Sequence, residues 1–125
     1  MTTVLAVEDN GANLKLLEAV LRHGGYDFLG AMNAADALAI VRNRRPDIIL
    51  MDIQLPDMHG MEATALLKES AETAEIPVIA GTAHAMAGDA KRFVAAGCAD
   101  YVAKPIRYAR LLEVVAKHVG AARSV

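Results

Sequence analysis

A chain of 125 residues, 54% of them hydrophobic, has the size and apolar content of one compact domain, so we expect a single domain over residues 1–125 with its core at about 3–119. The formal net charge of −2, from 15 acidic and 13 basic residues, argues against direct binding of nucleic acid. The chain has one cysteine, an acidic pair close to the N-terminus and no apolar run near the roughly 20 residues of a membrane helix, which predicts a cytoplasmic protein without a membrane segment.

Short aliphatic runs alternate with longer stretches of helical spacing along the chain. We predict five strands, TVLAV at 3–7, DFLGA at 27–31, DIILM at 47–51, IPVIAGT at 76–82 and DYVA at 100–103. A helical pattern follows each strand. Five strand–helix units therefore fill the length of the chain.

The predicted helices have recognisable ends. The first begins after Asn10 and ends at Gly24-Gly25, and the second begins at Asn33, a good N-cap, and must stop before Pro46. The other three are expected over about 58–71, 89–96 and 108–119. In the last helix an apolar stripe predicts core packing, and it consists of Tyr108, Leu111, Leu112, Val115 and Val119.

Alternating strands and helices, with strands that are apolar on both faces, predict an α/β fold with a parallel sheet between two helical layers. Known doubly wound, flavodoxin-like folds of five units commonly have the strand order 2-1-3-4-5, and we adopt that order here. In such folds ligands bind beyond the carboxyl ends of the strands, where the order reverses. We therefore expect the functional site at that end of the sheet.

Ionisable or hydroxyl side chains end four of the five predicted strands. Glu8 and Asp9 end the first strand, Asp52 the third, Thr82 the fourth and Lys104 the fifth. Any one of them would be ordinary at the rim of such a sheet. Three carboxylates in one crevice, however, would raise one another's pKa unless a positive charge lay among them.

A divalent cation would supply that charge. Carboxylates, a backbone carbonyl and waters form an oxygen site that suits Mg²⁺, with Mn²⁺ as an alternative, because Mg²⁺ keeps several waters and binds phosphoryl oxygens. Zinc is disfavoured because the potential nitrogen and sulfur ligands lack the necessary spacing; these are His23, His59, His84, His118 and Cys98.

An ionised aspartate beside Mg²⁺ can attack phosphorus and form an aspartyl phosphate. We assign Asp52 as the phosphoacceptor, Asp9 as a direct metal ligand and Glu8 as a ligand through water. Lys104 would neutralise the charge of the phosphoryl oxygens, and the hydroxyl of Thr82 would donate a hydrogen bond to one of them.

Four stretches together resemble the signatures of response-regulator receiver domains, and they are VEDN at 7–10, DIILMDIQLPDMHG at 47–60, IPVIAGTAHAM at 76–86 and GCADYVAKPI at 97–106. The resemblance covers essentially the whole chain. It is closest to stand-alone receivers of the DivK type and to the receivers of hybrid histidine kinases. It implies a CheY-like fold and a role in two-component phosphorelay signalling.

The resemblance also implies a mechanism. A histidine kinase or histidine phosphotransferase would phosphorylate Asp52 in a Mg²⁺-dependent step, with the metal held by Asp9, Asp52 and the backbone carbonyl of Gln54. Such a domain is a phosphoacceptor regulator, not a conventional enzyme, and promotes both formation and hydrolysis of its own aspartyl phosphate. Gln54 and His84 flank the expected path of the hydrolytic water.

For signal output, the resemblance implies that Thr82 is coupled to rotation of Tyr101 and that the Lys104–Pro105 peptide bond is cis. The face formed by the fourth helix, fifth strand and fifth helix would then change shape and alter the binding of a downstream signalling protein. Gly81 stands where such strands more often carry a bulky aliphatic residue, which predicts loose packing beside Thr82.

Other functions fit the sequence less well. A phosphatase of the haloacid dehalogenase type would have a second aspartate at position 54, where this chain has Gln54. An FMN-binding protein would have a phosphate-binding loop where EDNG places two negative charges, and an inactive receiver would be expected to have lost Asp52, Asp9 or Lys104. The chain is either a stand-alone receiver or a receiver cut from a hybrid kinase or larger regulator.

Overall fold

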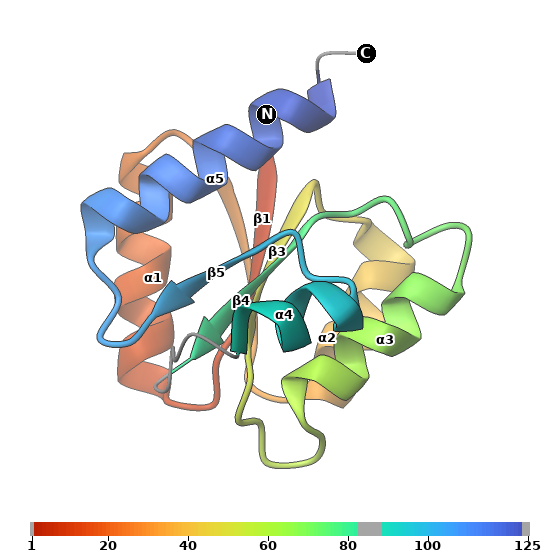
Figure 1. The fold of residues 1–125 in the computed structure, drawn as a ribbon. Coiled ribbons are helices and arrows are strands. Elements are labelled where there is room, and N and C mark those ends of the chain that lie inside the picture. Colours follow the sequence, from red (N-terminus) through yellow and green to blue (C-terminus); the bar gives the residue numbers. More distant parts are fainter. Residues whose placement is uncertain (1, 83–88, 124–125) are drawn as a thin grey trace.

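The structure is a computed structural model that describes residues 2–82 and 89–123. Five strands alternate with five helices along the described chain (Figure 1). In chain order these elements are β1 (Thr3–Val7), α1 (Gly11–His23), β2 (Asp27–Ala31), α2 (Ala34–Arg44), β3 (Ile48–Asp52), α3 (Gly60–Glu69), β4 (Val78–Thr82), α4 (Asp89–Ala96), β5 (Asp100–Ala103) and α5 (Tyr108–Arg123).

All neighbouring strands pair in parallel, and the sheet order is β2-β1-β3-β4-β5. Helices α1 and α5 cover one face of the sheet, and α2, α3 and α4 cover the other (Figure 1). The predicted α/β fold and strand order are therefore confirmed. The order reverses between β1 and β3, which places the carboxyl ends of these two central strands side by side.

The central strand β3 separates two hydrophobic cores. Ile49 and Met51 belong to the core under α2, α3 and α4, whereas Ile48 and Leu50 belong to the core under α1 and α5. Successive side chains of a strand point to opposite faces, so a continuous apolar run fills both cores. This packing fixes the backbone up to Asp52, the last residue of the strand.

Two helix starts are set by local caps, as predicted. The side chain of Asn10 accepts a hydrogen bond from the amide of Asn13, and Asn33 does the same for Asp36. After α1, Gly25 has a φ of 91°, a backbone conformation that favours glycine. The predicted bounds of β1, β2, α4 and β5 also agree with the structure.

Other boundaries differ from the prediction. Helix α3 begins at Gly60, because the preceding segment forms a loop that is closed by a hydrogen bond from the amide of Gly60 to the carbonyl of Ile53. It ends at Glu69, while α5 extends to Arg123. The strand β3 is shifted by one residue from the predicted 47–51 to Ile48–Asp52, and β4 is shortened from the predicted 76–82 to Val78–Thr82.

The predicted stripe of α5 is partly wrong. The side chain of Tyr108 is 47% exposed, whereas Val114, which the predicted stripe lacks, is buried as Leu111 and Val115 are. Among the described residues, no helix combines the length and the apolar character that crossing a membrane requires.

Candidate functional site

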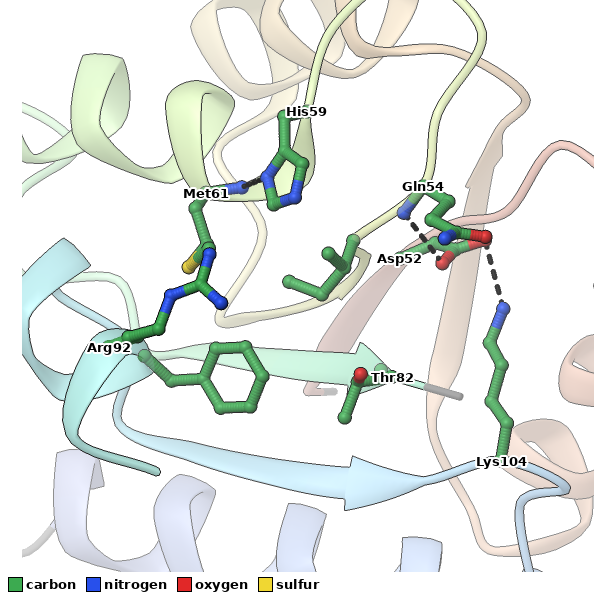
Figure 2. Close-up of a pocket in the computed structure, with 10 residues that line it drawn as sticks. Asp52, Gln54, His59, Met61, Thr82, Arg92 and Lys104 are labelled. Carbon is green, nitrogen blue, oxygen red and sulfur yellow. Dashed lines mark hydrogen bonds and ion pairs between the residues drawn. The ribbon is translucent and has the colours of Figure 1, made fainter. Parts of the chain in front are cut away.

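The polar residues predicted at strand ends come together at the carboxyl edge of the sheet. Glu8 and Asp9 follow β1, Asp52 ends β3, Thr82 ends β4 and Lys104 follows β5. Because β1, β3, β4 and β5 are consecutive neighbours in the sheet, their ends form one row. Figure 2 shows three of these residues, Asp52, Thr82 and Lys104, on one side of a hollow.

Three carboxylates form a cluster in this row. Glu8, Asp9 and Asp52 each offer one carboxylate oxygen, and these atoms lie within 4.8 Å of one another. Glu8 and Asp52 are buried, with 4% and 6% of their surface exposed, while Asp9 is exposed. A cluster of oxygen ligands that is open on one side fits Mg²⁺, which needs room for its own waters.

Lys104 connects the two buried carboxylates. Its Nζ atom lies 2.9 Å from Oδ2 of Asp52 and 3.1 Å from Oε2 of Glu8. Burial alone would lower the pKa of Lys104, but hydrogen bonds to Asp52 and Glu8 outweigh burial and raise it. The ammonium group is therefore charged at neutral pH and lies between the two buried acids.

The second oxygen of each buried carboxylate is held by the loop that follows it. Oδ1 of Asp52 accepts a hydrogen bond of 3.1 Å from the amide of Gln54, and Oε1 of Glu8 accepts one of 3.3 Å from the amide of Asn10. Each acid is thus fixed at one oxygen by a loop amide and at the other by Lys104. The orientation of both carboxylates is set before any ligand binds.

A hollow of about 180 Å³ adjoins Asp52 (Figure 2). Thr82, Gln54 and Lys104, which the sequence assigns to the site, are among the residues that line it. The hollow is also lined by residues that the sequence does not assign to the site, and these include His59, Met61, Arg92 and Phe93. No sequence signal marks them, because α3 and α4 bring them to the hollow only through packing.

Thr82 and Tyr101 lie on adjacent strands. The carbonyl of Thr82 accepts a 2.8 Å hydrogen bond from the amide of Lys104, which ties the end of β4 to β5. The ring of Tyr101 packs against Phe93 with centroids 5.5 Å apart and an interplanar angle of 45°. Since Phe93 lines the hollow, one aromatic contact separates Tyr101 from the site.

The surrounding backbone is closely fitted. The Lys104–Pro105 peptide bond is cis, the geometry that the resemblance implies. A Cβ atom added to Gly60 would overlap the backbone carbonyl of Asp52 and lie 2.8 Å from Cα of Ile53, so only glycine fits behind Asp52. His84, the other residue expected near the hydrolytic water, lies outside the described residues.

Gly81, where the sequence predicts loose packing beside Thr82, lines the hollow and has room for a Cβ atom, which would meet other atoms only at 3.8 Å. Gly81 is buried, and the Lys104 stem passes over it, because a Cβ atom on Gly81 would lie 3.8 Å from Cε of Lys104. The small residue thus leaves room for the lysine to reach Asp52.

Receiver domains share three features with this structure. These are the doubly wound topology, an aspartate at the end of the central strand, and a carboxylate cluster with a lysine at the sheet edge. The chain belongs to the family of response regulator receiver domains, whose pattern matches residues 4–116. It is therefore a signalling domain of the two-component type.

Particular relatives agree with this family. The polar-differentiation response regulator DivK of Brucella anthropi is 44% identical over 118 residues, which make up 94% of this chain and 96% of that protein. DivK of Brucella ovis is 42% identical over the same shares.

Solved structures show the same fold. The receiver domain of a sensor histidine kinase from Pseudomonas aeruginosa, which has a magnesium ion coordinated in its active site cleft, has a TM-score of 0.87 and 35% identity over 95% of this chain and 98% of that one. The signal receiver domain of a signal transduction histidine kinase from Syntrophus aciditrophicus has a TM-score of 0.91 and 26% identity over 100% and 95%.

Proposed function

We propose that the chain accepts a phosphoryl group on Asp52 from a phosphohistidine of a histidine kinase or histidine phosphotransferase, in a step that requires Mg²⁺. The observation that carries the proposal is the environment of Asp52, a buried carboxylate with an ammonium group 2.9 Å from one oxygen and two further acids around it. The proposal places the chain in the cytoplasm, where kinases that use ATP form phosphohistidine.

The transfer breaks one bond and forms another. A carboxylate oxygen of Asp52 attacks phosphorus, the bond from phosphorus to the donor imidazole breaks, and its electron pair stays on the ring nitrogen. Lys104, released from its contact with Asp52, then pairs with a phosphoryl oxygen, and the hydroxyl of Thr82 donates a hydrogen bond to another.

Mg²⁺, or Mn²⁺ in its place, would be held by Asp9, Asp52 and the backbone carbonyl of Gln54, with Glu8 binding through a water. When bound, it supplies positive charge to the phosphoryl oxygens as the leaving group departs. The three-acid cluster supports this assignment, since its donors are all hard oxygens.

The same site would promote both formation of the aspartyl phosphate from small phosphodonors and its later hydrolysis. In hydrolysis, water attacks phosphorus and Asp52 leaves as a carboxylate. The hollow that Asp52 and Gln54 both line supports this proposal, because it would give water a path to the phosphorus.

Output would follow from movement of Thr82 toward the phosphoryl group. The space that Thr82 leaves would admit the ring of Tyr101, and the face made of α4, β5 and α5 would change shape. A downstream signalling protein that binds this face in one state would bind it differently in the other. Support comes from the contact of Tyr101 with Phe93, a residue that lines the hollow.

Intact-mass analysis tests the central claim. The protein is incubated with acetyl phosphate, with and without Mg²⁺, as wild type, as Asp52→Asn and as the control Asp27→Asn, which removes an exposed acid on the edge strand β2. We expect one phosphoryl group on the wild type and the control, and none without Mg²⁺ or on Asp52→Asn. Addition that ignores the metal, or that persists on Asp52→Asn, would reject the site.

A second experiment tests the partners. Phosphohistidine transfer is measured directly with a phosphorylated histidine phosphotransferase as the donor, and downstream binding is measured with the phosphorylated and unmodified forms as bait. Equal capture of proteins by both forms would mean that phosphorylation does not control binding.

A further inference from the structure

The loop between β3 and α3 is tied to α2 by one carboxylate. Oδ1 of Asp57 accepts a hydrogen bond of 2.9 Å from the amide of Ala34, and Oδ2 accepts one of 3.0 Å from the amide of Ala35. These amides belong to the first two residues of α2, more than 20 positions earlier in the chain. Asp57 therefore caps a helix to which it does not belong.

This cap complements the local one. The side chain of Asn33 takes the amide of Asp36, at 2.8 Å, and leaves the first two amides of the helix to Asp57. The negative charge of Asp57 also lies at the positive end of the helix dipole. The hydrogen bonds from Ala34 and Ala35 lower the pKa of Asp57, so it stays ionised at neutral pH.

The same loop carries Gln54, three residues before Asp57. The two ends of this loop are fixed at the sheet. The amide of Ile53 donates a hydrogen bond of 3.1 Å to the carbonyl of Gly81, and the amide of Gly60 donates one of 2.7 Å to the carbonyl of Ile53. Asp57 fixes the far part of the loop to α2. The loop that follows Asp52 is thus held from two directions, by the sheet and by a helix.

We propose that Asp57 is a positioning residue for the metal site: by clamping the loop to α2, it holds the backbone carbonyl of Gln54 where a magnesium ligand is needed. This inference rests on the proposed function, because it takes that carbonyl as a ligand. The linkage is reciprocal, so Mg²⁺ that fixes the loop also strengthens the contact of Asp57 with the start of α2.

The affinity for Mg²⁺ of the unphosphorylated protein, measured by isothermal titration calorimetry, tests the proposal. Partners that orient metal ligands typically contribute about 10-fold or more in metal affinity, and we expect Asp57→Ala to bind Mg²⁺ about 10-fold more weakly. The Mg²⁺ affinity of Asp57→Asn should lie between those of the wild type and Asp57→Ala. The asparagine side chain keeps only one of the two acceptor oxygens, and it carries no charge.

Two control variants separate positioning from other effects. Asn33→Ala removes the other cap of α2 and should lower the midpoint of thermal unfolding while leaving Mg²⁺ affinity unchanged. Asp36→Asn removes a negative charge from the same helix end without touching the loop, so it reports how much of the change is long-range electrostatics. A loss of affinity in Asp36→Asn equal to that in Asp57→Asn would overturn the proposal.

Hydrogen exchange of the wild-type protein gives a test that needs no variant. We expect saturating Mg²⁺ to slow exchange of the amides of Ala34 and Ala35 more than that of Asp36, which bonds to Asn33. Equal protection of all three amides, or none, would contradict the linkage. The proposed function fails if the wild type neither binds Mg²⁺ nor is phosphorylated on Asp52. Only the inference on Asp57 fails if the wild type binds Mg²⁺ and is phosphorylated while Asp57→Ala binds Mg²⁺ as tightly as the wild type.

Discussion

The Nζ atom of Lys104 lies 2.9 Å from Oδ2 of Asp52, although β4 lies between β3, which Asp52 ends, and β5, which Lys104 follows. The lysine reaches this position by passing over Gly81, and it also contacts Glu8, which follows β1. One ammonium group therefore joins the ends of three strands. It places a positive charge against the two buried acids of the carboxylate cluster.

Replacement of Lys104 should make folding depend on Mg²⁺. In Lys104→Met the buried carboxylates of Glu8 and Asp52 lose their shared cation, and we expect a loss of about 2 kcal/mol in the free energy of unfolding without metal. Mg²⁺ should restore much of this loss, because it supplies positive charge to the same cluster. Urea unfolding with and without Mg²⁺ measures both effects, with Lys15→Met as a control at an exposed position. A variant as stable as the wild type without metal would contradict this role of the ion pairs.

Substitutions at Gly81 should act through the lysine. A Cβ atom at this position would lie 3.8 Å from Cε of Lys104, which is ordinary van der Waals contact, so Gly81→Ala should fold normally and phosphorylate at close to the wild-type rate. Gly81→Val adds two methyl groups beside the lysine stem and should slow phosphorylation by about 10-fold, since misplaced catalytic groups are costly. The rate with acetyl phosphate in Mg²⁺ provides the measurement. Similar rates for the valine and alanine variants would show that the path of Lys104 does not limit the reaction.

The pair of Asp100 and His118 should contribute a pH-dependent term to stability. Burial of Asp100 would raise its pKa, but a 3.0 Å hydrogen bond with His118 and a 2.8 Å bond from the amide of Tyr101 hold this pKa below the usual value of an aspartate. A carboxyl whose pKa falls on folding stabilises the protein above its unfolded pKa, and this stabilisation is lost as the pH falls through the folded value. Asp100→Asn should therefore be less stable than wild type at neutral pH, with the difference shrinking below about pH 4. Urea unfolding between neutral and acid pH tests this, and a difference that stays constant would exclude the carboxylate as its source.

The parts of the fold that could be predicted from sequence are those that depend on local signals. The caps at Asn10 and Asn33 each bond an amide three residues later, and the strands are apolar runs between turn residues. The sequence predicts the start of α3 too early, because the loop before it is closed by longer-range contacts of Gly60 and Asp57. Nothing in the local pattern around these two residues reveals those contacts.

The functional site, too, has parts that the sequence predicts and parts that depend on longer-range packing. Topology alone brings strand ends together, so Glu8, Asp9, Asp52, Thr82 and Lys104 could be identified as neighbours before any distance was known. The sequence could not indicate that one lysine bridges two buried acids. Nor could it indicate that residues of α3 and α4 line the hollow, because the rotation of these helices about their axes depends on how they pack on the sheet.

Removal of the Thr82 hydroxyl should separate phosphorylation from output. The substitution removes neither Lys104 nor any carboxylate of the acid cluster, so Thr82→Ala should still gain one phosphoryl group by intact mass, at a reduced rate. Its ability to change partner binding should fall, because nothing then draws residue 82 toward the phosphoryl group or opens space for Tyr101. Thr82→Ser keeps the hydroxyl and should keep most of the change. The measurement is the ratio of the affinities of a captured partner for the phosphorylated and unmodified forms of each variant. Allosteric couplings typically change such an affinity by about 5- to 150-fold, and we expect the ratio to approach one in Thr82→Ala. An unchanged ratio in Thr82→Ala would move the switch to another residue, and loss of phosphorylation in Thr82→Ser would instead indicate a defect in the site itself.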